Sequence, residues 1–139
     1  MANGKASPEQ LIARAREARE TAYAPYSKYK VGCAIMTEDG TVYAGANVEN
    51  ASYGLCVCAE RTAIVQAVCA GHRELDTIVV MTQSSPPAAP CGLCRQTINE
   101  FASRPEKLQL ILVNPQGERR DVIFSELFPY GFRGEHLTT

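Results

Sequence analysis

Three cysteines and one glutamate have the types and spacing of a reactive metal site. Cys58 and Glu60 form a Cys-x-Glu motif. Thirty residues separate it from Cys91 and Cys94, a Cys-x-x-Cys motif that follows Pro90. Residues three apart lie on one face of a helical turn, so these two thiolates can bind one ion. With Cys58 they would give zinc three protein ligands and leave a fourth position for water, which is typical of a catalytic zinc site.

The spacing also says where each motif must lie. Positions two apart on a helix point away from each other, so Cys58 and Glu60 can face one ion only if Cys58 is the N-cap residue. Helix N-termini stabilise thiolates through their free N–H groups and partial positive charge. Three thiolates leave a zinc centre with excess negative charge, which Arg61 and Arg95 could offset. On this hypothesis, Arg61→Ala raises the pH at which activity begins.

A second metal arrangement stays open. Cys56 could join the three candidate ligands and form a closed four-cysteine structural site, which would describe a non-catalytic module. The substitution Cys56→Ser would then release zinc, whereas a catalytic site would retain it. Cys33 and Cys69 stand in apolar runs and are expected to be buried thiols. His72 and His136 lack ligand spacing and are expected at the surface.

Hydrophobic periodicity and turn signals predict elements in the order αββαβαββα. We expect helices over residues 8–21, 59–70, 92–102 and 125–128, and strands over 29–36, 41–48, 77–81, 108–113 and 120–122. This order predicts a layered α/β/α domain, with helices on both faces of a mixed sheet of about five strands. Both cysteine motifs begin core helices, so the site forms if the two helix starts meet.

Composition limits the class of protein. The chain has 139 residues, 45% of them hydrophobic, and a formal net charge of −1. This predicts a single domain over residues 1–139 with an ordinary core and a flexible segment at 1–7. Balanced charge argues against nucleic-acid binding, and the sequence has neither an apolar run of about 20 residues nor a secretory signal. We therefore expect a cytoplasmic protein whose six cysteines are not paired in disulfides and whose clustered cysteines bind a metal.

Further stretches of sequence extend the pattern beyond the metal motifs. They are residues 24–29 (APYSKY), 47–51 (NVENA), 58–63 (CAERTA), 90–96 (PCGLCRQ) and the tail at 127–132. With these, the sequence resembles the zinc-dependent nucleoside and nucleobase deaminases, and within them the small cytidine deaminases, over about residues 22–137. The resemblance implies one Zn²⁺ per subunit in a homotetramer. It also implies hydrolysis of cytidine and deoxycytidine to uridine, deoxyuridine and ammonia, in pyrimidine salvage.

The resemblance assigns roles around the metal. Cys58, Cys91 and Cys94 would hold zinc, which activates a water molecule. Glu60 would not be a ligand but would take a proton from the water, pass it to the pyrimidine ring and later protonate the departing amine.

Other residues would bind the substrate. Asn47 and Glu49 alternate on an expected strand and so share a face. The resemblance implies that they bind the ribose 3′-hydroxyl, and the alternative is that they are exposed strand-end residues. Tyr29 stands where the family commonly has a phenylalanine stacked on the base, and Ala59 is also implied at the substrate. Phe132 matches a tail aromatic that reaches a neighbouring subunit's site, although ordinary packing would also explain both aromatic residues.

Other deaminases compete with this interpretation. An enzyme that edits nucleic acid needs a basic channel for the backbone, which the balanced charge disfavours. A deaminase of a cytosine-containing antibiotic nucleoside would share the zinc motif. The run Asn47-Val48-Glu49-Asn50 is more similar to that of the cytidine enzymes.

Overall fold

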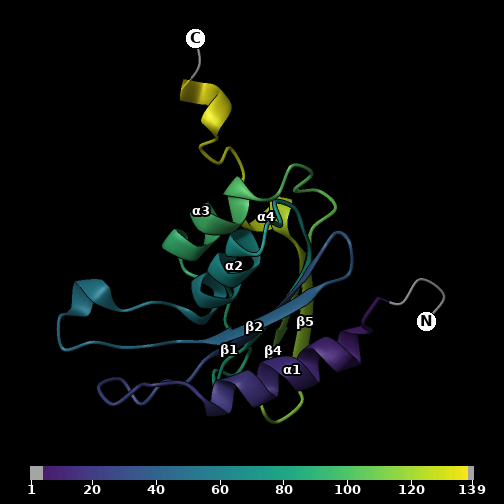
Figure 1. Cartoon of the computed structure of the whole chain (residues 1–139). Helices are drawn as coiled ribbons and strands as arrows, with labels where there is room; N and C mark the ends of the chain where they lie inside the picture. Colours follow the sequence, from purple (N-terminus) through teal and green to yellow (C-terminus); the bar gives the residue numbers. More distant parts are fainter. Residues whose placement is uncertain (1–4, 138–139) are drawn as a thin grey trace.

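The computed structural model describes residues 5–137 and contains one mixed sheet (Figure 1). Its strands lie in the order β2-β1-β3-β4-β5. The β3–β4 pair is parallel and the other neighbouring pairs are antiparallel. The strands are β1 (Gly32–Thr37), β2 (Val42–Ala46), β3 (Leu75–Met81), β4 (Gln109–Val113) and β5 (Arg119–Ile123). The predicted mixed five-stranded sheet is confirmed.

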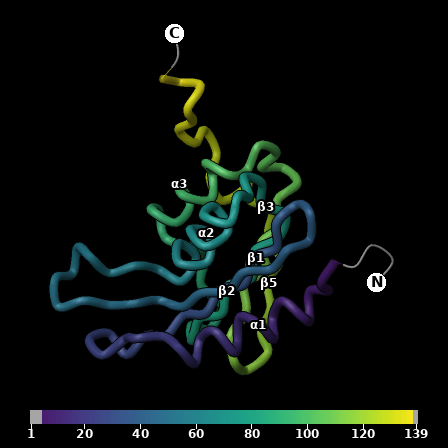
Figure 2. The backbone as a smooth tube through the Cα atoms, in the orientation of Figure 1, coloured from purple at the N-terminus to yellow at the C-terminus, as the bar shows by residue number. Residues whose placement is uncertain are grey.

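Helices cover both faces of this sheet, as predicted (Figure 1). Helix α1 (Pro8–Glu20) packs on one face, and α2 (Ala59–Cys69) and α3 (Gly92–Glu100) pack on the other. The short helix α4 (Phe124–Leu127) follows β5 directly. Two 3₁₀ helices that the sequence analysis did not predict are η1 (Tyr53–Leu55) and η2 (Gly134–Leu137). The backbone tube in Figure 2 shows the C-terminal segment leaving the body beyond α3.

Close packing of the helices on the sheet fixes where the cysteine motifs lie. All six residues of β1 are buried, because the strand has a helix on each side. A Cβ atom on Gly45 of β2 would lie 2.2 Å from Thr62 Oγ1 of α2, so only glycine permits this approach. The Thr62 hydroxyl also donates to the Ala46 carbonyl at 3.0 Å. The beginning of α2 is therefore held directly on the edge of the sheet.

Most predicted elements are confirmed, with several local differences. The strand expected over residues 29–36 begins only at Gly32, so Tyr29 precedes it. The first helix begins at Pro8, as predicted, because the Ser7 hydroxyl caps it by accepting from Gln10 N–H at 3.2 Å. The second strand was expected to reach residue 48 but ends at Ala46, because the Asn47 side chain takes over the pairing with the neighbouring segment. Cys69 is exposed, so the prediction of a buried thiol there is wrong. It lies five positions after Ile64, which places it on the outer side of α2.

Other expectations concern the ends and the surface. Of the segment expected to be flexible, residues 1–4 lie outside the described residues, and 5–7 lead irregularly into α1. Cys33 is buried as predicted. Among residues 5–137, no helix is long and apolar enough to cross a membrane.

Candidate metal centre and substrate cavity

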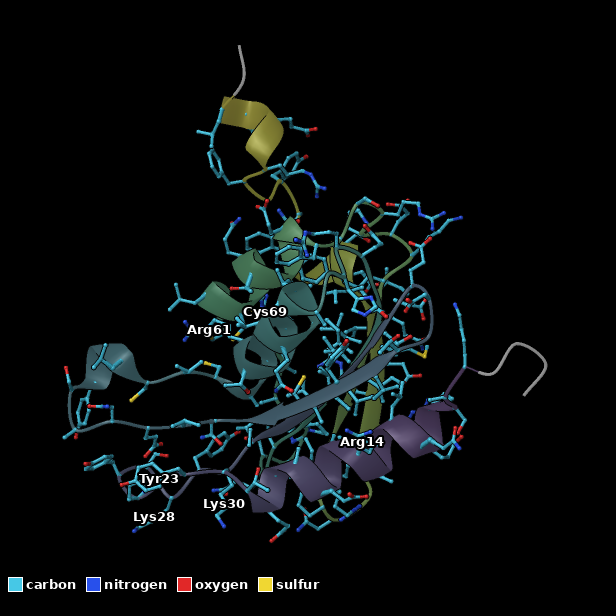
Figure 3. All side chains as sticks on the ribbon, in the orientation of Figure 1. Arg14, Tyr23, Lys28, Lys30, Arg61 and Cys69 are labelled. Carbon is cyan, nitrogen blue, oxygen red and sulfur yellow. The ribbon has the colours of Figure 1, made fainter. Side chains whose placement is uncertain are left out.

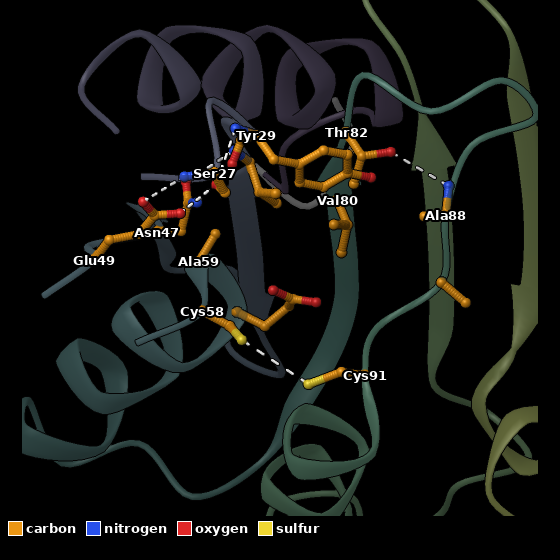
Figure 4. Close-up of a pocket in the computed structure, with 13 residues that line it drawn as sticks. Ser27, Tyr29, Asn47, Glu49, Cys58, Ala59, Val80, Thr82, Ala88 and Cys91 are labelled. Carbon is orange, nitrogen blue, oxygen red and sulfur yellow. Dashed lines mark hydrogen bonds between the residues drawn. The ribbon is translucent and has the colours of Figure 1, made fainter. Parts of the chain in front are cut away.

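Three cysteine sulfurs meet where α2 and α3 begin. Two of them, those of Cys58 and Cys91, are drawn in Figure 4. Cys58 is the N-cap residue of α2, with φ −74° and ψ 156°, and Cys91 is the N-cap residue of α3. Cys94 lies in the first turn of α3 and is buried. The three Sγ atoms lie within 4.8 Å of one another, and those of Cys58 and Cys91 are 3.9 Å apart. The predicted cap position of Cys58 is confirmed.

This sulfur triangle fits a zinc ion. Tetrahedral zinc with bonds of about 2.3 Å to sulfur would hold its ligands about 3.8 Å apart. Cys56 does not join the cluster, since its sulfur contacts the backbone N–H and carbonyl of Asn50 at 3.4 Å and 3.7 Å. Within the described chain the metal-binding group consists of Cys58, Cys91 and Cys94 alone. The four-cysteine alternative is therefore not formed.

The surroundings favour a thiolate at Cys58. A hydrogen bond from the Cys94 thiol, followed by one from Arg61, lowers the pKa of Cys58 to about 5. The same hydrogen bond with Cys58, together with burial, raises the pKa of Cys94. Arg61 Nη2 lies 3.8 Å from Cys58 Sγ, beside the start of α2 (Figure 3). Arg95 instead donates to the carbonyls of Pro90 and Leu127, both at 2.7 Å.

Glu60 is the buried acid of the site. It lies in the first turn of α2, lines the same cavity as Cys58 and Cys91, and is only 4% exposed. Burial, with a smaller contribution from the charge of Cys58, raises the pKa of Glu60 to about 7. A carboxyl group with such a pKa can both accept and return a proton near neutral pH.

A cavity of about 420 Å³ opens above these groups, a size suited to one small molecule (Figure 4). Five segments of the chain supply its lining. They contribute Ser27, Tyr29 and Val31; Asn47 and Glu49; Cys58, Ala59 and Glu60; Val80 and Thr82; and Ala88, Ala89 and Cys91. The sequence analysis missed Ser27, Val31, Val80, Thr82, Ala88 and Ala89. Ser27 lies in the APYSKY stretch at 24–29, but no motif marks the other five, although Val80 and Thr82 alternate around the end of a predicted strand.

Asn47 and Glu49 lie together at one end of the cavity (Figure 4). Asn47 Oδ1 accepts from Val31 N–H at 2.9 Å, and its Nδ2 donates to the Tyr29 carbonyl at 2.8 Å. The Glu49 carboxylate accepts from the Ser27 hydroxyl and from the backbone N–H groups of Tyr26 and Ser27, at 3.0 Å and 3.1 Å. These bonds, that of the Ser27 hydroxyl first, lower the pKa of Glu49. Both side chains are thus ordered within the cavity wall, and their oxygens retain acceptor capacity.

The two aromatic candidates lie in different places. Tyr29 lines the cavity, and its hydroxyl is hydrogen-bonded to the hydroxyl of Ser84. Phe132 belongs to the tail and is 54% exposed, and its ring centroid lies 5.5 Å from that of His136. It does not line the cavity of its own chain. Its carbonyl accepts from Gln96 Nε2 and Asn99 Nδ2, which fixes the start of the tail on α3.

Comparisons with known proteins agree with this geometry. A family model described as the cytidine and deoxycytidylate deaminase zinc-binding region matches residues 5–110. The chain is 42% identical over 130 residues to a cytidine deaminase of Sporosarcina psychrophila, covering 94% of each chain. It is 44% identical to that of Halalkalibacterium halodurans, over 93% of this chain and 96% of the relative. A crystal structure of cytidine deaminase from Burkholderia pseudomallei superposes with a TM-score of 0.86 at 48% identity, over 91% of this chain and 100% of the other.

Proposed function

This chain belongs to the cytidine and deoxycytidylate deaminase family, and we propose that it hydrolyses cytidine and deoxycytidine to uridine and deoxyuridine, releasing ammonia. The observation that carries the proposal is the buried Glu60 beside three converging cysteine sulfurs, on the floor of a cavity of about 420 Å³. Hydrolysis of an amidine needs an activated water and a group that moves protons, and this floor holds the side chains for both. Pyrimidine salvage is the role in which such a reaction is used.

The residues around the metal have different roles in the proposed reaction. Bound by Cys58, Cys91 and Cys94, zinc would supply a Lewis acid that lowers the pKa of water towards about 7. Glu60 takes one proton from the attacking water and delivers it to the ring nitrogen of the base. It then takes the remaining proton of the new hydroxyl on C4 and delivers it to the amine, which departs as ammonia as the C4 carbonyl forms. Arg61, 3.8 Å from Cys58 Sγ, offsets part of the thiolate charge and so keeps the centre electrophilic.

The other end of the cavity would hold the nucleoside. Asn47 and Glu49 present oxygens that can accept hydrogen bonds from a ribose hydroxyl. The resemblance to the cytidine deaminases assigns this contact to the 3′-hydroxyl, which cytidine and deoxycytidine share, so both nucleosides fit the proposal. The ring of Tyr29 would stack on the pyrimidine, and Ala59, between Cys58 and Glu60, would contact it from the floor.

We further propose a cytoplasmic homotetramer in which the whole chain forms one domain per subunit. Exposed aromatic and aliphatic side chains on the loops and tail support association, among them Tyr26, Tyr53, Leu55 and Phe132. Phe132 of one subunit would then reach a neighbour's cavity. The three cysteines outside the metal group, Cys33, Cys56 and Cys69, form no disulfide, which favours a reducing compartment. The residues that line the cavity include no Lys or Arg, which argues against a nucleic-acid substrate. A sedimentation mass of about 60 kDa, four times 15.1 kDa, tests the tetramer.

A substrate panel tests the activity. The zinc-loaded protein is incubated with cytidine, deoxycytidine, cytosine and single-stranded DNA, and loss of the cytosine chromophore is followed. We expect rapid loss with both nucleosides, slow loss with cytosine and none with DNA. No change with cytidine, while zinc remains bound, would contradict the proposed function.

A further inference from the structure

A series of hydrogen bonds joins the turn after β4 to the ring that faces the cavity. Asn114 directly follows β4 and is 1% exposed. Its Nδ2 donates to the Ser84 carbonyl at 3.1 Å and to Glu118 Oε1 at 2.8 Å, while its Oδ1 accepts from Glu118 N–H at 3.0 Å. The Ser84 hydroxyl in turn bonds the hydroxyl of Tyr29. Three segments far apart in the sequence thus meet at Ser84.

The wall segment over residues 83–90 depends on such bonds for its position. It contains no helix or strand, yet Ala88 and Ala89 line the cavity. Its inner contact is the Ala88 N–H, which donates to Thr82 Oγ1 at 3.3 Å. Asn114 is anchored on the buried strand β4, which pairs with β3 on one side and β5 on the other. The sheet therefore supplies a rigid reference point from which Asn114 holds this wall.

Tyr29 also depends on side-chain hydrogen bonds for its position, because it lies in the irregular segment before β1. Its backbone carbonyl is held by Asn47 Nδ2 at 2.8 Å, and its phenol hydroxyl is held by Ser84. A ring restrained at both ends loses less conformational entropy when a base stacks on it. The hydroxyl of Tyr29 thereby has a partner in the protein rather than in the substrate.

We propose that Ser84 and Asn114 are positioning residues that hold the Tyr29 ring in place for the pyrimidine base. This inference rests on the proposed function, since it concerns binding of the same nucleoside. Neither residue touches the reacting atoms, so both act through Tyr29. A ring that is less well placed weakens the bound nucleoside and its transition state together, so KM should rise while kcat changes little.

A double-mutant cycle tests the contact, with cytidine as the substrate and thermal unfolding as the check on folding. Tyr29→Phe and Ser84→Ala each delete one hydroxyl, and each should raise KM about threefold to tenfold, the effect of one hydrogen bond, with kcat within about twofold. The double variant should match either single variant, because both break the same bond. The control is Thr41→Ala, which also removes one hydroxyl group. The Thr41 hydroxyl donates to Asp39 in the turn between β1 and β2, outside the cavity, so this variant should keep the KM of the unsubstituted protein.

Asn114 is tested by two further variants. Asn114→Ala removes both donors, and Asn114→Asp keeps an acceptor for the Glu118 N–H but loses the donor to Ser84. Both should raise KM about as much as Ser84→Ala while zinc content stays the same. If neither Asn114 variant folds, the double-mutant cycle of Tyr29→Phe and Ser84→Ala decides whether the Tyr29 ring is positioned in this way.

The contrary results are distinct from failure of the proposed function. An unchanged KM in Ser84→Ala, or additive effects of Tyr29→Phe and Ser84→Ala, would overturn the inference. So would an Asn114→Asp variant with normal KM. If the unsubstituted protein does not deaminate cytidine, the proposed function itself fails before any variant is compared.

Discussion

The two ends of the cavity are built in different ways, and their glutamates show what the difference does. At the zinc end, Glu60 lies in the first turn of a helix packed on the sheet, and its burial raises its pKa to about 7. At the other end, Glu49 lies on an irregular segment, and hydrogen bonds from Ser27 and Tyr26 lower its pKa. The same side chain is thus prepared to carry protons at one end and to remain a fixed acceptor at the other.

The largest contrast is expected among the cysteines. Cys91→Ser should lose zinc and with it all measurable turnover, because the site would retain only two thiolates. Cys56→Ser is the matched control, and it should keep one zinc per chain and nearly full activity, since its sulfur contacts Asn50 instead. Metal analysis and cytidine turnover check both variants. Zinc loss in Cys56→Ser would show that the site is closed rather than catalytic.

Glu60→Gln should have the next largest effect. The amide keeps the shape of the side chain but cannot carry a proton, so kcat should fall by a factor of about 10²–10⁴. Zinc content should not change, because Glu60 is not among the three ligands. Steady-state kinetics with metal analysis measures both quantities. Substantial turnover by this variant would remove Glu60 from the mechanism.

Glu49→Gln should act on binding rather than on chemistry. Loss of a charge-assisted hydrogen bond to the sugar should raise KM for cytidine about tenfold to a hundredfold, while zinc content remains normal. The substitution should leave the slow reaction of free cytosine nearly unchanged, because cytosine has no sugar. Kinetics on both substrates give the comparison, and an equal loss with cytosine would argue against a sugar contact.

The smallest expected effect concerns pH. Because the pKa of Glu49 lies below its ordinary value of 4.5, its carboxylate stays ionised at every pH above that value. Its contribution to binding is present there and is lost only as the pH falls below 4.5. The ratio of uridine dissociation constants between Glu49→Gln and the unsubstituted protein should thus be the same at about pH 8 and about pH 5.5. A ratio that approaches one at the lower pH would mean that Glu49 titrates as Glu60 does.

The same comparison explains which parts could be predicted from sequence. The zinc end could be predicted from sequence, because residue spacing and helix-cap geometry dictate where Cys58, Cys91 and Cys94 lie. The alternation of Asn47 and Glu49 along an expected strand also predicted that they share a face, and both line the cavity. The predicted strand was too long, since β2 ends at Ala46. Local rules could not find Ala88 and Ala89, because that wall segment has no periodicity and is held by Asn114 from a distant strand. Cys69 was misassigned because an apolar run does not say which side of a helix faces outward.

The central claim is that one zinc held by three cysteines, with Glu60 beside it, deaminates cytidine. The most direct measurement removes the metal with a chelator and returns zinc in known amounts while uridine and ammonia are quantified. We predict that activity rises in proportion to zinc and stops rising at one zinc per chain, with one ammonia released for each uridine. A protein that binds one zinc per chain and forms no uridine would contradict this account.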